Sequence, residues 1–568
     1  MITYSLYSNH LTRGATEISN FSEFKLFSFG DYLLCIHGES KFVDDCITID
    51  CEDYFFFLEG IVLNKKSLSK NYDSWESFVN SQISMTSEQL LWDKFNGSFS
   101  GLYFCKKSQV LMSFNDHIGS KAVYFYLKDN DFILSNKISL LRTILNSQFN
   151  RKLKIEDESA YSLLSYGFTL EGKTLFQNVA KLSPGSYLKR DFNSLTESSY
   201  FRFCNNPDPS ISFRDAIDIV DEYFTTAVRL QFEKDKEYGY AHLVGLSGGL
   251  DSRMVTMVAN ELGYIDQTNF TFSQSDYLDE SIAKKIASDL QHEWIFKFLD
   301  NGSFLKNLDE VTNISGGEVL YYGLSHGLSI YSLLNFEKFG LLHTGQLGDV
   351  ALGTYYSSDD FDKRIASGDG AFSKTFSDKV NIDINKYPNQ ELFNFYNRGF
   401  SGINCGLKPI QEKTETFSPF YEKNFLEACL KIPPEIRFGH NLYKEWIKAR
   451  HPNAANYIWE KTGEKIAAKT ICFKGKRFTI SQFFNILFYK TTGYQYRGVD
   501  SKRHMNPYEY WLRKNRSLSK YIDDYYNENI SLFQDGELKS DIAALFDNGS
   551  ALNKLQVASL LSAKKVFE

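Results

Sequence analysis

A Ser/Gly-rich hexapeptide, Ser247 to Ser252, joins an apolar run at 241–246 to a segment at 252–262 that has the periodicity of a helix. When a strand ends in such a turn at a helix N-terminus, free backbone N–H groups and the positive end of the helix dipole point to one place. Gly248 and Gly249 allow close approach of a ligand, and the serine hydroxyls add donors. The pattern predicts a phosphate-binding loop, with an ordinary glycine-rich turn as the alternative.

Two aspartates extend this prediction to a metal ion. Asp251 lies inside the hexapeptide, where it would repel a phosphate unless it holds a bridging Mg²⁺, and no lysine of the Walker type follows. A second apolar run, 341–343, leads into the loop Thr344-Gly345-Gln346-Leu347-Gly348-Asp349. We expect Asp251 and Asp349 to share one Mg²⁺ between ATP phosphates, because Mg²⁺ takes one or two carboxylates and completes its shell with phosphate oxygens and water. Alone, Asp349 would be read as a turn or helix-cap residue.

Composition places the chain among globular proteins. Its 568 residues, 43% hydrophobic and 23% charged, suggest two to four domains with a substantial core. A net charge of −7 disfavours stable nucleic-acid binding. We find no apolar run long enough for a transmembrane segment and no signal-peptide pattern at the start of the sequence, so we expect a cytoplasmic protein. Eight cysteines without a Cys-x-x-Cys pair favour reduced thiols over disulfides or zinc ligands.

The pattern of predicted elements changes twice along the chain, which suggests domains at 1–204, 205–470 and 471–568. The first is rich in short strands, and the polar, proline-containing stretch 205–210 has the composition of a linker. After the linker, helices alternate with short apolar strands, which predicts a parallel sheet with ligands beyond the carboxyl ends of its strands. We expect strands at 32–36, 54–63, 98–104, 110–114, 122–127 and 131–135, then helix 213–232, strand 241–246, helix 252–262, strand 269–273, helix 279–290 and strand 294–298.

These motifs resemble those of the asparagine synthetase family, which includes β-lactam synthetases and lasso-peptide macrocyclases. The family carries an SGG-x-DS loop, a Ser/Thr-Gly-x-Gly-x-Asp loop, a glutamate four residues before Pro-Phe, and a further lysine. This chain offers, in the same order, Ser247 to Ser252, Thr344 to Asp349, Glu415 before Pro419-Phe420, and Lys461. The segment 114–125 is similar to a motif of the family's first domain, so the resemblance covers roughly the first 465 residues.

The resemblance implies an α+β fold followed by an α/β fold. The first domain would be a glutamine amidotransferase type 2 domain, β-rich and similar to Ntn (N-terminal nucleophile) hydrolases. The second would be a PP-loop ATP pyrophosphatase (adenine nucleotide α-hydrolase-like) synthetase domain with a parallel sheet. A basic, aromatic-rich helical region would complete the chain.

The implied activity is that of an AMP-forming carbon–nitrogen ligase. A carboxylate is adenylated by Mg-ATP with release of pyrophosphate, and an amine then attacks. Lys461 would stabilise charge on the adenylate and on the tetrahedral intermediate, with Lys465 as the alternative lysine and a solvated surface lysine as the simplest reading. A non-catalytic nucleotide-binding relative is the other possibility, but retention of the metal and catalytic residues favours the enzyme. The implied ATP-binding residues are Ser247, Gly248, Gly249, Asp251, Ser252 and Gly345; the metal ligands are Asp251 and Asp349; the catalytic candidates are Glu415, Lys461 and Gln346.

The chain also departs from the family pattern. Glutamine-using members begin with a cysteine after the initiator methionine, whereas this sequence begins Met1-Ile2-Thr3, and the family's Asn-Gly-Glu segment reads Glu59-Gly60-Ile61. We therefore expect a degenerate glutaminase domain. The amine would then come as free ammonia, from a separate glutaminase, or as part of the substrate, as in β-lactam synthetases and lasso cyclases.

The second loop departs as well. Gln346 stands where asparagine synthetases carry Glu and β-lactam synthetases carry Tyr. An amide cannot accept a proton usefully at neutral pH, so general-base work would fall to Glu415, and Gln346 would orient the substrate. This change leaves the carboxylate substrate open.

Residues 461–520 are strongly basic, with fourteen Lys/Arg against three acidic residues and interleaved aromatics. In an acidic protein this excess predicts attraction of an anion: an acidic carrier such as a nucleotide sugar, a lipid diphosphate at a membrane surface, or a partner protein. A solvated face of a helical cap is the alternative. The substrate is correspondingly open between a uronic acid amidated during surface polysaccharide synthesis and a peptide cyclised onto its own amine.

Overall fold

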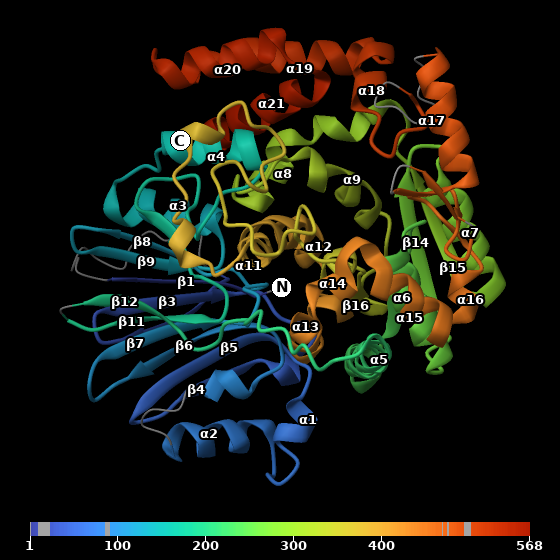
Figure 1. Ribbon diagram of the computed structural model, residues 1–568. Helices are drawn as coiled ribbons and strands as arrows, with labels where there is room; N and C mark the ends of the chain where they lie inside the picture. The colour runs from blue at the N-terminus through green and yellow to red at the C-terminus, as the bar shows by residue number, and fades with distance from the viewer. Residues whose placement is uncertain are drawn as a thin grey trace.

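The computed structural model describes residues 2–8, 23–85, 91–192, 194–468, 470–473, 476–492 and 501–568. It contains a β-rich first domain, a second domain built on a parallel sheet, and a largely helical C-terminal region (Figure 1). The expected succession of an α+β and an α/β fold is confirmed. Among the described helices, none has both the length and the apolar character needed to cross a membrane.

The first domain is a stack of two six-stranded antiparallel sheets, with strand orders β10-β8-β9-β1-β3-β2 and β12-β11-β7-β6-β5-β4. One apolar core fills the space between them, and separate cores lie under the helices on either side. The strands are β1 (Thr3–Ser8), β2 (Lys25–Phe29), β3 (Tyr32–His37), β4 (Ile47–Asp50), β5 (Tyr54–Val62), β6 (Gly97–Cys105), β7 (Val110–Asn115), β8 (Tyr124–Lys128), β9 (Asp131–Ser135), β10 (Val179–Lys181), β11 (Ser186–Arg190) and β12 (Leu195–Ser199).

The burial of strand β5 on both of its faces reflects the four layers of this domain. Every residue of β5 is buried, because successive side chains point to opposite faces and both faces are covered. Phe55 and Phe57 enter the core between the sheets, whereas Phe56 and Leu58 pack toward α2. The helices that cover the two outer faces are α1 (Lys65–Leu68), α2 (Trp75–Met85), α3 (Ile138–Phe149) and α4 (Asp157–Tyr166). The resulting α-β-β-α arrangement is the Ntn-like architecture expected for this domain.

The second domain contains a five-stranded sheet of order β15-β14-β13-β16-β17, in which every neighbouring pair is parallel. Helices cover both faces: α5, α6 and α7 share one core, and α9 and α12 contribute to a smaller core opposite. The strands are β13 (Ala241–Gly245), β14 (Gln267–Ser273), β15 (Glu293–Phe298), β16 (Phe339–His343) and β17 (Thr416–Phe417).

The first helix of this domain, α5 (Phe213–Glu237), begins at a capping box formed by Ser212 and Asp215 directly after the linker. The other helices are α6 (Leu250–Glu261), α7 (Leu278–Leu290), α8 (Leu308–Ser315), α9 (Tyr322–Tyr331), α10 (Gly348–Ala351), α11 (Gln390–Asn394), α12 (Lys408–Gln411), α13 (Lys423–Lys431), α14 (Pro434–Arg437), α15 (Asn441–Arg450) and α16 (Pro452–Ala455). A short hairpin, β18 (Ile458–Trp459) and β19 (Glu464–Lys465), carries Lys461 in its turn.

The C-terminal region has two parts. A hairpin, β20 (Thr470–Phe473) and β21 (Lys476–Thr479), precedes helix α17 (Ile480–Thr492). Helices α18 (Tyr508–Lys514), α19 (Arg516–Asn529), α20 (Glu537–Asn548) and α21 (Ala551–Phe567) then share one core with α3 and α4 of the first domain and α8 of the second. Of the predicted basic, aromatic-rich segment, Lys469, Lys474, Tyr494, Tyr496 and Arg497 lie outside the described residues, as does Met1.

Candidate functional site

The hexapeptide Ser247 to Ser252, called the phosphate loop below, lies at the carboxyl end of β13 and opens α6. Two serines connect the ends of the loop by hydrogen bonds: Ser252 Oγ accepts from Ser247 N at 2.9 Å, and the two hydroxyl oxygens are also 2.9 Å apart. Gly249, in extended conformation, is the N-cap of α6. Its neighbour Gly248 donates its N–H to Asp279 Oδ1 at 2.7 Å. The loop thus stands at the edge of the parallel sheet where the sequence predicts it.

The second loop, Thr344 to Asp349, packs directly on the first turn of α6, and its glycines make this possible. A Cβ on Gly345 would lie 2.4 Å from the backbone nitrogen of Ser252, and one on Gly348 would lie 2.6 Å from Cγ of Asp251. Leu347 adopts a left-handed conformation with φ of 66°, which is uncommon for a branched residue and typical of functional loops. We call Thr344 to Asp349 the aspartate loop.

This packing brings the two predicted metal ligands together. The backbone N–H of Asp349 donates to Asp251 Oδ2 at 3.1 Å. Desolvation and the charge of Asp349 hold the pKa of Asp251 well above its usual value, although a hydrogen bond from Tyr443 and the ammonium of Lys461 act in the opposite direction. Desolvation likewise raises the pKa of Asp349, against the cations Lys461 and Arg398. Two carboxylates that each disfavour the other's charge fit a site for a divalent cation such as Mg²⁺.

A cavity of about 630 Å³, called the aspartate cavity below, contains this pair. Lys461 is exposed within its wall, whereas Lys465, on strand β19, is not among the lining residues. Tyr277, the N-cap residue of α7, also lines the cavity and donates a hydrogen bond to Glu460, the residue before Lys461. The lining of the cavity includes Gly249, Asp251, Asp349, Tyr443, Lys461 and Arg503.

Three residues of this site have no counterpart among the sequence predictions. Tyr443 on α15 donates its hydroxyl to Asp251 Oδ1 at 2.9 Å. Asp279 on α7 accepts from the phosphate loop, and burial raises its pKa to about 6. Arg253, which is fully buried, donates to the carbonyl of Gly248 at 3.1 Å and to carbonyls of the segment just before Lys461, at residues 454, 457 and 458. All three residues lie on helices, and the sequence of a helix does not distinguish a polar residue that reaches a site from one that faces solvent.

The two remaining catalytic candidates lie elsewhere. Gln346 is fixed through its backbone oxygen, which accepts from Ser418 Oγ at 2.8 Å. Its side-chain Oε1 is buried with no hydrogen-bond partner among the described residues. Glu415 precedes β17, where its backbone oxygen accepts from Leu342 N at 2.9 Å, so it lies beside β16 rather than beyond the end of that strand. Neither residue lines the aspartate cavity.

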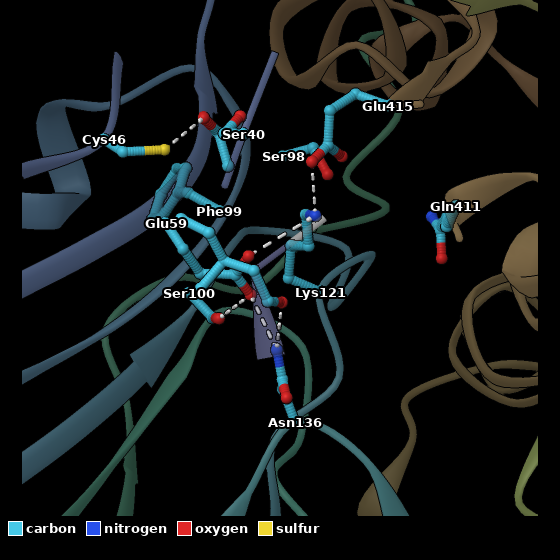
Figure 2. A network of polar contacts seen from close by, with 12 residues as sticks. Ser40, Cys46, Glu59, Ser98, Phe99, Ser100, Lys121, Asn136, Gln411 and Glu415 are labelled. Carbon is cyan, nitrogen blue, oxygen red and sulfur yellow. Dashed lines mark hydrogen bonds and ion pairs between the residues drawn. The ribbon is translucent and has the colours of Figure 1, made fainter. Parts of the chain in front are cut away.

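Glu415 belongs instead to a network between the two domains (Figure 2). Its Oε1 accepts from Nζ of Lys121, in the first domain, at 2.7 Å, and the same ammonium lies 3.6 Å from Oε2 of Glu59 on β5. All three side chains are buried, and we call them the interdomain ion network. Although burial opposes its charge, the two carboxylates hold the pKa of Lys121 above its usual range. Burial raises the pKa of Glu415, against the charge of Lys121, and its Oε2 has no hydrogen-bond partner among the described residues.

Glu59, which by resemblance stands where the family carries asparagine, belongs to this network. Besides its ion pair with Lys121, Glu59 accepts from Ser100 Oγ at 2.9 Å and from Asn136 Nδ2 at 3.4 Å (Figure 2). The hydroxyl of Tyr4 on β1 donates to Ser100 at 3.1 Å. The start of β1 and this part of β5 are therefore joined by a continuous set of buried polar contacts.

Comparisons with known proteins match two separate parts of the chain. A glutamine amidotransferase domain matches residues 10–201, and an asparagine synthase domain matches residues 220–355. A Methanocaldococcus jannaschii protein, named as a candidate glutamine-hydrolysing asparagine synthetase, is 25% identical over 214 residues. The match covers 36% of this chain and spans only 40% of that relative's length.

Several solved structures overlap with parts of the chain. Glutamine phosphoribosylpyrophosphate amidotransferase of B. subtilis is 9% identical, with 47% of this chain and 51% of that chain covered and a TM-score of 0.21. The NH3-dependent NAD synthetase of Campylobacter jejuni is 18% identical, with coverages of 25% and 61% and a TM-score of 0.19. The NMN synthetase of Francisella tularensis is 12% identical, with coverages of 41% and 95% and a TM-score of 0.18. Scores this low carry no argument about this chain.

Proposed function

Because this chain belongs to the asparagine synthetase family, we propose that it is an ATP-dependent, AMP-forming carbon–nitrogen ligase. It adenylates a carboxylate, releases pyrophosphate, and passes the acyl group to an amine. The observation that carries this proposal is the convergence of the N-terminus of α6, two aspartates and Lys461 in one cavity. Such a set of groups can bind a nucleoside triphosphate and stabilise the negative charge of its phosphates.

The roles of the cavity residues follow from their chemistry. Backbone N–H groups at the start of α6 would bind phosphate oxygens, because they carry the positive end of the helix dipole. Asp251 and Asp349 would hold Mg²⁺, which when bound neutralises phosphate charge. Lys461 would stabilise the negative charge that develops at the reacting phosphate and carboxyl oxygens. We assign this role to Lys461 over Lys465 because only Lys461 lines the cavity.

We keep Glu415 as the proposed general base for the incoming amine, with Gln346 as a substrate-orienting amide. Two observations support Glu415: burial raises its pKa, which makes it a stronger base, and one of its oxygens has no hydrogen-bond partner among the described residues. The ion pair with Lys121 supports the alternative role of positioning the two domains. The variants Glu415→Gln and Lys121→Met separate these roles.

We further propose that the first domain does not hydrolyse glutamine. The support is Glu59, whose buried carboxylate and ion pair occupy the position where the family holds glutamine through an asparagine. A carboxyl group has no amide NH2 with which to donate hydrogen bonds to glutamine as an asparagine can. The amine would then arrive as ammonia or as part of the substrate. Release of glutamate from glutamine by the purified protein would contradict this proposal.

Pyrophosphate exchange tests the ligase proposal directly. The full chain is incubated with ATP, Mg²⁺, labelled pyrophosphate and a panel of carboxylates that includes aspartate and free and nucleotide-linked uronic acids. We expect exchange with one class of carboxylate, and its loss in Asp251→Ala and in Asp349→Ala, because each variant removes a ligand of the shared cation. Asp266→Ala, which removes an exposed carboxylate just after α6, is the matched control.

Two outcomes would contradict the assignment. Near-normal exchange in either Asp251→Ala or Asp349→Ala would show that the aspartates do not share a catalytic metal ion. Formation of ADP in place of AMP would exclude adenylation altogether.

A further inference from the structure

A second cavity, of about 240 Å³, lies between the first two domains, at the chain that joins them. Its wall is made by residues from the turn after β7 and from 171–186 in the first domain, from 202–206, and from 386–401 in the second domain. Among the described residues, none lines both this cavity and the aspartate cavity. We call it the linker cavity. Domain interfaces are frequent places for small-molecule sites, so a ligand is the default hypothesis for such a space.

Four aromatic rings line one part of the linker cavity and contact one another. The buried rings of Phe203 and Phe400 have centroids 5.7 Å apart. Tyr396 lies beside Phe400, with centroids 5.3 Å apart, and its hydroxyl accepts from Phe203 N at 3.0 Å. The ring of Tyr387 follows, 6.2 Å from that of Tyr396. This connected aromatic surface suits a flat or branched apolar group.

The wall also carries charged side chains of both signs. Arg202 is exposed, and its guanidinium has neither a hydrogen bond nor an ion pair with a described residue. Glu171 has a left-handed backbone with φ of 58°, and its Oε1 is buried with no hydrogen-bond partner among the described residues. Burial raises the pKa of Tyr387, and the charges of Glu171 and Arg202 act on it in opposite directions, which places both charges near its hydroxyl.

A second acceptor in the wall lacks a partner. The amide of Asn205 donates through Nδ2 to Glu391 at 2.6 Å, whereas its Oδ1 is buried with no hydrogen-bond partner among the described residues. Buried polar atoms without partners are rare in folded proteins and call for a bound water, ion or ligand. Because Asn205 Oδ1 and Glu171 Oε1 are both acceptors, the group that satisfies them is a donor such as an ammonium.

We propose that the linker cavity binds a free α-amino acid with an aromatic or branched apolar side chain, as an effector of the aspartate cavity. The side chain packs on the aromatic rings, the α-carboxylate pairs with Arg202, and the α-ammonium donates to Glu171. A simple anion would meet the carboxylate of Glu171, and a simple cation would meet the guanidinium of Arg202, so a zwitterion matches the wall better than either.

The other cations of the wall and the size of the cavity agree with this ligand. Lys181 is already paired, with its Nζ 3.5 Å from Glu318, whereas Lys386 is exposed and adds a second cation for the α-carboxylate. The volume is below the range of about 300–1,000 Å³ that is typical of sites for drug-sized ligands. A single amino acid is therefore a better fit than a nucleotide or a peptide.

One element of the wall also contacts the aspartate loop. It is the π-helical segment Phe395–Ile403, a rare conformation that is frequent at functional sites. Tyr396 and Phe400 of this segment line the linker cavity, whereas a Cβ on Gly399 would lie 3.6 Å from the side chain of Leu347 in the aspartate loop. We therefore expect a bound amino acid to change the affinity of the aspartate cavity for ATP. This effect rests on the proposed function, whereas amino-acid binding does not.

Isothermal titration calorimetry of the full chain with L-phenylalanine tests the binding. The comparison ligands are 3-phenylpropionate, which lacks the ammonium, and 2-phenylethylamine, which lacks the carboxylate. We expect phenylalanine to bind at least tenfold more tightly than either, because each loses a charge-assisted contact worth about tenfold or more in affinity. Equal binding of the three compounds, or no binding of phenylalanine or L-leucine at millimolar concentrations, would overturn the proposal.

Substitutions assign the binding to the linker cavity. Arg202→Ala should weaken phenylalanine binding about tenfold or more, because the α-carboxylate loses its partner. Glu171→Gln should remove the preference for phenylalanine over 3-phenylpropionate, because its neutral amide no longer attracts the ammonium. The matched control is Arg214→Ala, which removes an exposed arginine outside the wall and should leave binding unchanged. Wild-type affinity in Arg202→Ala, or a preference that survives in Glu171→Gln, would overturn the assignment.

A variant that fills the cavity tests the same assignment without changing a charge. Ser401 lines the linker cavity, so the ring of Ser401→Phe should occupy the space of the ligand and abolish binding. Circular dichroism shows whether this variant folds; if it does not, Arg202→Ala and Glu171→Gln decide. Phenylalanine binding by a folded Ser401→Phe protein would place the ligand elsewhere and overturn the proposal.

Titration of Mg-ATP with and without saturating phenylalanine tests the effect on the aspartate cavity. We expect the ATP affinity to change by about fivefold or more, and ATP to change the affinity for phenylalanine by the same factor. Equal ATP affinities would overturn the effector role. Absence of ATP binding would contradict the proposed function alone, because phenylalanine binding is measured without ATP. Asp251→Ala should bind phenylalanine like the wild type, since Asp251 does not line the linker cavity.

Discussion

At the scale of single residues, Lys121 and Glu415 give the sharpest prediction. Glu415→Gln should leave pyrophosphate exchange near normal, because the aspartate cavity does not contain Glu415. If the carboxylate accepts the proton of the amine, amide formation should slow by about 10²- to 10⁴-fold and acyl-adenylate should accumulate. Rapid-quench measurement of the two half-reactions distinguishes these rates.

Lys121→Met is the control for this experiment. It removes the ion pair at 2.7 Å but keeps the Glu415 carboxylate, so it reproduces a positioning defect without removing a base. Breaking a buried pair on one side should lower the free energy of unfolding by about 3–5 kcal/mol. If Lys121→Met slows amide formation as much as Glu415→Gln does, the carboxylate acts by holding the domains together and not as a base.

The site residues differ in how far the sequence predicts them. Asp251 and Asp349 are predictable because each follows an apolar strand, and parallel strands bring their carboxyl ends to one edge. Tyr443 and Arg253 are not, since their contacts depend on how α15 and α6 pack against distant segments. The ion pair of Lys121 with Glu415 joins residues 294 positions apart in different domains, and no local pattern encodes it.

At the scale of elements, the contact of the aspartate loop with α6 depends on the absence of a side chain. Gly345→Ala should push the loop off α6, because its Cβ would lie 2.4 Å from a backbone nitrogen that belongs to the helix. We expect the rate of pyrophosphate exchange to fall by at least about 10²-fold, because small displacements of binding groups slow enzymes by about this much.

Gly406→Ala is the matched control, because nothing lies within 4 Å of a Cβ at that position. It should keep exchange and stability close to wild type. An active Gly345→Ala variant would mean that the aspartate loop is free to move away from α6 during the reaction.

The turn after β7 predicts a pH dependence of stability. His117 is buried among aromatic rings, and burial, aided by the charge of Lys423, lowers its pKa to about 3. Below its unfolded-state pKa of about 6.5, only the unfolded chain binds a proton there, so stability falls as pH falls. At pH 5.5 the protonation of His117 in the unfolded chain lowers the free energy of unfolding by about 1.4 kcal/mol.

Urea unfolding at pH 7.5 and 5.5 measures this effect. His117→Phe, whose ring can occupy the same aromatic surroundings, should reduce the loss of stability between the two pH values by about 1.4 kcal/mol. An unchanged difference would show that the imidazole takes up its proton in the folded state.

The elements themselves follow the sequence closely where periodicity is strong. The strand expected at 131–135 is β9, the helix expected at 279–290 is α7, and the strand expected at 110–114 is β7, each within one residue of its bounds. Helices α3 and α4, of 12 and 10 residues, have no such prediction, because a short helix between strands is hard to distinguish from a loop until the sheet that it covers is known.

At the scale of the whole molecule, α21 packs against α4 of the first domain and α8 of the second, and all three helices share one core. Residues that interact through one core are expected to unfold together. Thermal unfolding should therefore show a single transition by circular dichroism and by tryptophan fluorescence.

Leu561→Ala tests this coupling, because Leu561 of α21 is fully buried. It should destabilise the protein by about 2–5 kcal/mol and lower the temperature of that single transition. Leu532→Ala, at an exposed position, should change the free energy of unfolding by less than about 0.5 kcal/mol. Two separate transitions, with only one shifted by Leu561→Ala, would show that the domains unfold independently.

The buried guanidinium of Arg253 has a consequence for recognition. It fastens the phosphate loop to the segment that leads to Lys461, through hydrogen bonds that need no ligand. The entropy of ordering these two parts is therefore lost when the chain folds and not when ATP binds. The spacing between the groups that would hold the nucleotide is thus preorganised, so their ordering does not weaken its binding.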